Sequence, residues 1–223
     1  VVGINFKYWT GISVDPNTEL LYACSIGSSD GDYIYTWGYP EEGDLLLVLI
    51  AKDDDVAMTS DSSMTREVYI AGSDYSVYAF WKIATSSDIT TGYVSFSGDS
   101  EEYFGKLFVI SGFDSTSPID AVDTTGATGT TNSPYAPSIT VLANSLVFAI
   151  AGMDDSDIPY SLDTAGWTVS LNGDADDTGA VIGIRDALTS GSTGQVDFTT
   201  NASDGWAAFQ IAVAAIINEL TSK

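Results

Sequence analysis

The sequence predicts an all-β protein, a two-sheet antiparallel sandwich of the jelly-roll type. The main observation is an apolar run at residues 45–51, with turn-forming residues 40–44 before it and Lys52 and three aspartates after it. Seven apolar residues between such boundaries are typical of a strand that is covered on both faces. A similar run, residues 144–151, also precedes acidic residues. No segment between the runs shows helical periodicity with caps, so we expect helices to be short or missing.

The residues before the first apolar run predict an arm and short strands. Residues 1–13 are apolar and aromatic with few charges, and we interpret them as an N-terminal arm. A turn follows at residues 15–18, then a short apolar strand at 20–26 and a hairpin connection at 27–32. The aromatic side chains of Tyr33, Tyr35 and Trp37 alternate along the next strand. They therefore share one face, which is either part of the core or displayed.

Further strands and two connections are expected after the first run. Residues 52–67 are polar and without periodicity, which predicts a long loop, and strands are expected at 75–82, 91–97 and 107–110. Residues 112–137 are rich in Gly, Ser, Thr and Asp and contain three of the six prolines. This composition predicts a surface crossover without a helix.

The second half of the chain repeats the first. Residues 77–82, 92–96 and 102–110 match residues 180–185, 194–198 and 204–212, and with the two apolar runs the offsets are 101 to 103 residues. A half with one apolar face cannot bury that face alone, so we expect the halves to pack face to face about 10 Å apart. The predicted organisation is an arm (1–13) and a single sandwich domain (14–223). Its halves, about 20–111 and 138–217, are joined by the crossover 112–137.

The charge balance excludes two classes of partner. The chain has 31 acidic and 7 basic residues and a formal net charge of −24. Binding to a phosphate backbone depends on cations that displace counterions, and anionic lipid repels acidic surfaces in the same way, so we expect neither nucleic acid nor membrane as a partner. The longest apolar runs have seven residues, far fewer than the ~20 that cross a bilayer.

The cysteine and histidine content excludes several chemistries. Cys24 is the single cysteine, so no internal disulfide forms, and its apolar surroundings indicate a small buried side chain. Histidine is absent. Serine and cysteine hydrolases that use a histidine base, and ordinary zinc sites, are therefore excluded.

Acidic clusters at the ends of predicted strands are the candidate metal ligands. Calcium takes about six to eight oxygen ligands, which loop carboxylates can supply. None of the clusters has the spacing of a calcium-binding loop, so we favour solvated acids and assign no catalytic, cofactor-binding or metal-binding residue. A glycosidase needs a pair of carboxylates across a cleft, and no pair stands out. The clusters are Asp30 and Asp32; Asp53, Asp54 and Asp55; Asp154, Asp155 and Asp157; and Asp174, Asp176 and Asp177.

Aromatic residues are the candidates for sugar binding. Trp81 and Trp206 lie in apolar strands and are expected in the core, whereas Tyr33, Tyr35 and Trp37 are the candidates for display. Asn201 begins a glycan acceptor pattern, which carries meaning only in a secreted eukaryotic protein.

Four segments in order resemble a group of tailed-bacteriophage virion proteins. In that group GDLLV, YKIA, SGVDPTTPID and SDAWAA recur in this order. The corresponding segments here are residues 43–48, 80–88, 111–120 and 202–208, so the resemblance covers about residues 30 to 215. The motifs mark strand ends and turns. The chain departs from the group in its very acidic loops and its aromatic arm.

The resemblance implies a structural component of a virus particle, such as a capsid decoration (cement) protein or a head or tail appendage. Such a protein is not an enzyme and needs no cofactor. Its partners would be the major capsid protein or other virion proteins, and copies of itself in a homo-oligomer such as a trimer, on the exterior of the virion. The alternatives from other classes are a carbohydrate-binding or adhesin sandwich, a histidine-free glycosidase and a subunit of an extracellular filament.

Overall fold

The computed structural model describes residues 32–35, 40–60, 62–91, 93–97, 101–154, 161–175, 178–187 and 189–215. The predicted arm, the predicted strand 20–26, Cys24 and Trp37 lie outside these ranges. The described chain is built almost entirely of antiparallel strands, and its helix α1 (Ser86–Thr91) has six residues. The all-β prediction is confirmed.

The first half contains a four-stranded sheet with the order β4-β5-β2-β7. Strand β2 is the predicted run of apolar residues, and it pairs with β5 on one side and with β7 on the other. A smaller sheet with the order β1-β6-β3 accompanies it. The strands are β1 (Asp32–Tyr35), β2 (Leu45–Asp53), β3 (Thr59–Ser60), β4 (Thr65–Ala71), β5 (Tyr75–Ile83), β6 (Tyr93–Ser97) and β7 (Tyr103–Ile110).

The second half contains a larger sheet with the order β14-β15-β12-β18-β8, and β9 also pairs with β18. Two small sheets, β10-β17-β13 and β11-β16, accompany it. The strands are β8 (Ile119–Val122), β9 (Ala127–Gly129), β10 (Tyr135–Ala136), β11 (Thr140–Val141), β12 (Ser145–Asp154), β13 (Ser161–Leu162), β14 (Thr168–Ala175), β15 (Thr178–Ala187), β16 (Gly191–Ser192), β17 (Val196–Thr199) and β18 (Trp206–Val213).

The two large sheets pack face to face through a shared central core. Leu47 and Leu49 of β2 belong to one buried cluster with Phe148 of β12 and Phe209 of β18. The rings of Phe108 and Phe148 meet across the interface, with centroids 4.8 Å apart. The expected packing of the two halves against each other is therefore confirmed.

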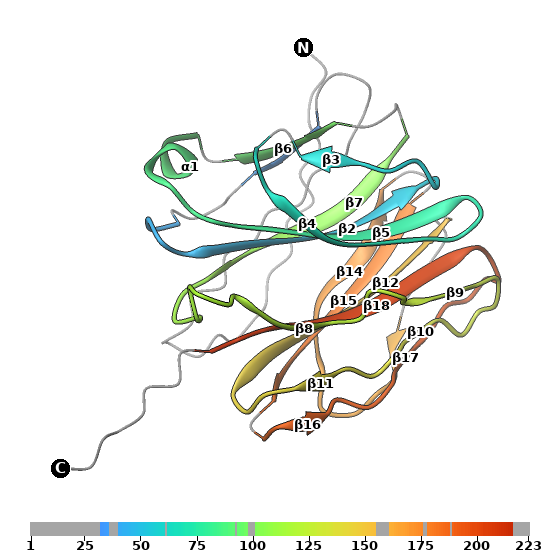
Figure 1. Ribbon diagram of the computed structural model, residues 1–223. Helices are drawn as coiled ribbons and strands as arrows, with labels where there is room; N and C mark the ends of the chain where they lie inside the picture. Colours follow the sequence, from blue (N-terminus) through green and yellow to red (C-terminus); the bar gives the residue numbers. More distant parts are fainter. Residues whose placement is uncertain are drawn as a thin grey trace.

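The sandwich is thicker than the expected two sheets, because small sheets cover the outer faces of the large ones (Figure 1). Leu46 and Val48 face away from the central core and pack with Val94 and Phe96 of β6. In the second half, Phe198 of β17 packs in the same way on the outer face of β12 and β18. Successive side chains of a strand point to opposite faces, and a strand that is apolar at every position needs cover on both.

Two segments expected to lack regular structure contain strands. The predicted loop 52–67 contains β3 and the start of β4, and the predicted crossover 112–137 contains β8, β9 and the short β10. Most of these strands have only two to four residues, and pairing with strands distant in the sequence, rather than a local sequence pattern, defines them. The crossover thus extends the second sheet by pairing with β18.

The two halves have corresponding strand orders and irregularities. The order β4-β5-β2-β7 corresponds to β14-β15-β12-β18, and β1-β6-β3 corresponds to β10-β17-β13. The first strand of each large sheet has a register shift at the same place, between Arg66 and Val68 in β4 and between Val169 and Leu171 in β14. The sequence repeat of about 102 residues itself stays a prediction.

The turns before β2 and β12 also correspond. Gly43 (φ +99°) donates its N–H to the Ala84 carbonyl, with an N···O distance of 3.0 Å. Asn144 (φ +65°) donates to the Ala187 carbonyl at 2.6 Å. Both residues have the left-handed backbone that glycine and asparagine tolerate best, so each large central strand begins from the same kind of turn.

Candidate functional site

Among the residues that the structure describes, Asp53, Glu101 and Glu102 form a cluster of three carboxylates. One oxygen atom from each lies within 4.8 Å of the others. Asp53 ends β2, and the two glutamates come just before β7, which runs antiparallel to β2. The sequence pattern identified Asp53 as a candidate metal ligand, but it did not identify Glu101 or Glu102. The signal that identifies them is the antiparallel pairing, which places the start of one strand beside the end of the other.

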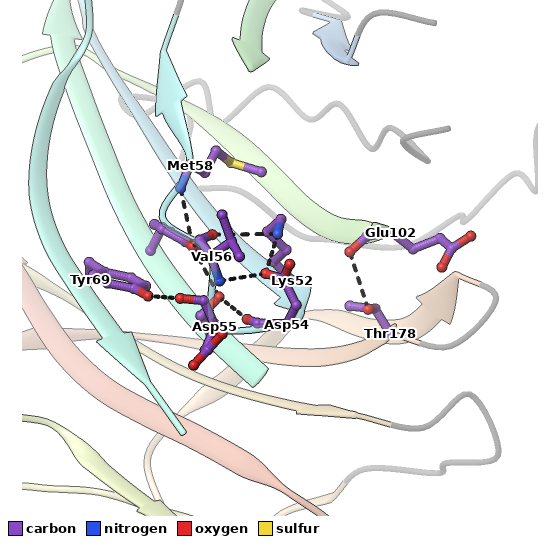
Figure 2. A network of polar contacts seen from close by, with 10 residues as sticks. Lys52, Asp54, Asp55, Val56, Met58, Tyr69, Glu102 and Thr178 are labelled. Atoms are coloured by element: carbon purple, nitrogen blue, oxygen red, sulfur yellow. Dashed lines mark hydrogen bonds and ion pairs between the residues drawn. The ribbon is translucent and has the colours of Figure 1, made fainter. Parts of the chain in front are cut away.

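Lys52 is a buried cation next to this cluster. Its side chain is only 1% exposed, and its ammonium group forms an ion pair with Asp54 (Figure 2). It also donates to the Val56 carbonyl at 3.4 Å. An ammonium group loses its hydration when it is buried, so it needs such partners.

Asp54 holds the loop after β2 in a strained conformation. Its φ is +145°, a value that non-glycine residues rarely adopt. Its carboxylate accepts the Val56 N–H at 2.8 Å, and its carbonyl accepts the Ser76 hydroxyl at 2.6 Å. These bonds fix the turn, and they bring the Asp54 carboxylate to Lys52.

Two tyrosines tie the same loop to the sheet. The Tyr78 hydroxyl donates to the Val56 carbonyl at 3.0 Å and accepts the Met58 N–H at 3.3 Å. Burial raises the pKa of Tyr78 to about 12. The Tyr69 hydroxyl donates to the Asp55 carbonyl (Figure 2), and burial, followed by the nearby carboxylates of Asp55 and Asp54, raises its pKa.

The arrangement therefore works as a clamp on residues 54–58. The polar groups of Lys52, Asp54, Tyr69 and Tyr78 are directed at the loop backbone or at each other. The three clustered carboxylates offer hard oxygen ligands, but calcium needs about six to eight. The chemistry that the contacts support is the fixing of a loop at the end of the central sheet.

Two of the other acidic candidates that follow β2 lie among the described residues. Asp154 and Asp174 are described and lie in β12 and β14, whereas Asp30, Asp155, Asp157, Asp176 and Asp177 lie outside the described residues. Asp32, Tyr33 and Tyr35 lie in β1, of which the backbone alone is described. The candidate sugar platform formed by Tyr33, Tyr35 and Trp37 therefore stays a prediction.

The tryptophans expected in the core behave differently. Trp206 is 3% exposed and packs in the outer core of the second half, where the ring of Tyr135 meets it edge-on at 5.6 Å. Trp81 is half-buried against the central core, and its indole N–H donates to Glu67 at 2.9 Å. The expectation is confirmed for Trp206, and Trp81 lies at the margin of the core. Asn201, of the glycan acceptor pattern, is exposed.

No protein-family model matches this chain, and no similar protein is found among curated sequences or solved structures. Among the described residues, no helix is long and apolar enough to cross a membrane.

Tyr78→Phe is expected to destabilise the protein by about 1–2 kcal/mol at pH 8, because the Val56 carbonyl and the Met58 N–H lose a buried partner. The difference in the free energy of unfolding between the wild-type protein and the variant should shrink as the pH rises from about 10 to about 12. Unfolded tyrosine ionises near pH 10, whereas the folded pKa is about 12, so the stabilisation present below pH 10 is lost through this window. Urea denaturation of both proteins at several pH values measures this difference in stability.

The control is Tyr135→Phe, since Tyr135 is 39% exposed. Its effect on the free energy of unfolding at pH 8 should be small. A Tyr78→Phe effect that stays constant up to pH 12 would contradict the clamp.

Proposed function

We propose that this chain is a structural component of a virus particle, namely a capsid decoration (cement) protein or a head or tail appendage, which acts through protein–protein contacts. The observation that supports the proposal most is the structural role of the residues in the four motif segments. These segments resemble tailed-phage virion proteins, and the contacts of their residues stabilise turns and strand ends.

The first two motif segments contact each other. The Gly43 N–H donates to the Ala84 carbonyl at 3.0 Å, and the Ala84 N–H donates to the Asp44 carbonyl at 2.7 Å. The two segments thus close the end of the β2–β5 pair.

The second segment also begins the single described helix. Lys82 donates to the Asp88 carboxylate at 2.7 Å, and the Thr85 N–H donates to it at 2.8 Å. Burial opposes ionisation of Asp88, but the hydrogen bonds from Lys82 and Thr85 outweigh it and lower the pKa of the carboxyl. An acidic side chain that accepts the N–H at the start of a helix stabilises that helix.

The third and fourth segments fix the second sheet. The Asp114 N–H donates to the Ala214 carbonyl at 2.9 Å, and the Ala214 N–H donates to the Pro118 carbonyl at 2.9 Å. Asp120 accepts the Leu142 N–H at 2.7 Å. The Gly205 carbonyl accepts the Asp154 N–H at 3.0 Å. These polar groups of the third and fourth segments therefore form hydrogen bonds within the fold.

Because the motif residues stabilise the fold, the proposed assembly contacts are formed by the rest of the surface. A β-sandwich with a net charge of −24 suits contacts with basic surfaces on a shell and a soluble particle exterior. The proposed partners are the major capsid protein or other virion proteins, and further copies of the chain in a homo-oligomer such as a trimer. Nucleic acid and membrane are not proposed as partners, and the proposed location is the exterior of the virion.

The test is to purify virus particles whose genome encodes this chain and to image them with a gold-labelled antibody fragment against it. We expect label at symmetry-related positions on the exterior and a fixed number of copies per particle by quantitative mass spectrometry. Particles that lack the chain would overturn the proposal. A variant without residues 1–13 should keep its far-UV circular dichroism but lose association, if the arm is the contact.

A further inference from the structure

The basic side chains of the described chain are mostly turned into the protein. Five of the seven basic residues lie in the described ranges. Lys52 and Lys106 are buried, with 1% and 5% of their surface exposed. Lys82 and Arg185 are half-buried, and Arg66 alone among these five is exposed. The described surface therefore carries little positive charge.

Two of these cations form ion pairs that solvent reaches poorly. The Lys82 ammonium group lies 2.7 Å from the Asp88 carboxylate, and the two side chains are 16% and 11% exposed. The Lys52 ammonium group pairs with Asp54, and these side chains are 1% and 22% exposed. Dissolved salt screens partly buried pairs much less than exposed ones. Added salt should therefore weaken these two attractions little.

The other three basic residues each donate a hydrogen bond to an uncharged group of the protein. Lys106 donates to the Ser170 hydroxyl at 2.9 Å, Arg66 to the Met58 carbonyl at 3.0 Å and Arg185 to the Thr193 carbonyl at 2.9 Å. These bonds hold the positive charges against the fold, so they are not displayed among the carboxylates of the surface.

The acidic side chains have the opposite distribution. Many of them are exposed, in loops and in strands of both halves. In the cluster of Asp53, Glu101 and Glu102, the carboxylate oxygens lie within 4.8 Å of one another. Like charges are therefore crowded at the described surface. The exposed acidic residues of the described ranges are Glu41, Glu42, Asp55, Asp74, Glu101, Asp163, Asp174, Asp186 and Asp197.

This distribution makes the folded state repel itself. The chain has a formal net charge of −24, and folding brings its charges closer together than they are in an unfolded chain. Dissolved salt limits the repulsion to a Debye length of about 8 Å at 0.15 M and about 3 Å at 1 M. Carboxylates as close as 4.8 Å are therefore screened well only near the upper of these concentrations.

We propose that this protein is built to fold in a concentrated salt solution, on the order of 1 M, in which dissolved cations screen its acidic surface. The sign of the effect follows from where the charges lie. The attractive pairs are partly buried, where salt acts weakly, whereas many acidic side chains are exposed, where salt acts strongly. Salt therefore stabilises the fold. The inference does not depend on the proposed function, since it rests on the positions of the charges.

The first test is thermal unfolding of the whole chain, followed by circular dichroism, in about 0.05 M to about 2 M NaCl. We expect the midpoint temperature to rise by about 10 °C and to keep rising above about 0.5 M. KCl should act equally, because screening depends on ionic strength. A midpoint that stays constant or falls would overturn the proposal. A full rise with about 1 mM CaCl2 at the lowest NaCl concentration would also overturn it, because it would show a specific cation site.

The second test separates screening from the general effect of salt on apolar burial. Glu42→Gln, Asp74→Asn and Asp186→Asn together remove three exposed negative charges. The matched control combines Glu42→Asp, Asp74→Glu and Asp186→Glu, which change the same side chains but keep their charge. We expect the neutral variant to unfold at a higher temperature than the control in about 0.05 M NaCl, and the difference to shrink in about 2 M NaCl. An equal salt dependence of the two variants would assign the effect to apolar burial and overturn the proposal.

Discussion

Gly152→Ala is expected to lower the free energy of unfolding by about 3 kcal/mol. Gly152 lies in β12, where a methyl group would meet the Tyr75 hydroxyl and would lie 2.7 Å from the Ala51 Cβ atom. Tyr75 is fully buried, and its hydroxyl donates to the Gly179 carbonyl of the opposite sheet at 3.2 Å. The added methyl group must therefore separate the sheets or break this bond. Urea denaturation followed by circular dichroism measures the loss.

A double-mutant cycle identifies the cause. Tyr75→Phe alone removes the hydrogen bond to the Gly179 carbonyl, worth about 1 kcal/mol, and it also removes the hydroxyl that the new methyl group meets. The double variant should therefore be more stable than the sum of the single effects implies. Gly205→Ala is the control, because a methyl group there meets nothing within 4 Å. Equal losses for Gly152→Ala and Gly205→Ala would contradict close packing of the two sheets.

Gln210→Glu is expected to cost about 4 kcal/mol at pH 7. Gln210 of β18 is fully buried, and its amide nitrogen donates to three carbonyl groups, those of Ala136 at 3.2 Å, Pro137 at 2.9 Å and Gly194 at 2.8 Å. A carboxylate has no hydrogen to donate, and it would place a buried negative charge against these oxygens. The bonds that hold the β10 and β17 region onto β18 would be lost.

The loss should depend on pH in a defined direction. Burial and the facing carbonyls raise the pKa of the introduced carboxyl above that of unfolded glutamate, about 4.3. The variant is then least impaired below pH 4 and becomes less stable as the pH rises. Gln195→Glu is the matched control, because Gln195 is exposed in the same part of the chain. A Gln210→Glu variant as stable as the control at pH 7 would contradict the assigned contacts.

The fold was predictable where the residues of a single strand form a recognisable pattern. The run of apolar residues that became β2 predicts a strand covered on both faces, and the structure places Leu47 in the central core and Leu46 in the outer one. The absence of helical periodicity was also reliable, since the described helix α1 has six residues.

The strands and the acidic cluster that the sequence did not predict depend on tertiary contacts. Strands β4 and β14 are the first strands of the large sheets in the described chain and have register shifts, so no simple alternating pattern marks their whole length. The outer sheets consist of strands of two to five residues in the described chain, which pairing with distant partners defines. Asp53 meets Glu101 and Glu102 because β2 and β7 are neighbours, and strand order cannot be obtained from one sequence.

The central claim is that the two halves form one folding unit around the core between the large sheets. Differential scanning calorimetry tests it most directly. We predict one thermal transition, with a calorimetric enthalpy equal to the van't Hoff enthalpy. Two separate transitions, with Gly152→Ala lowering the temperature of one of them alone, would contradict the shared core.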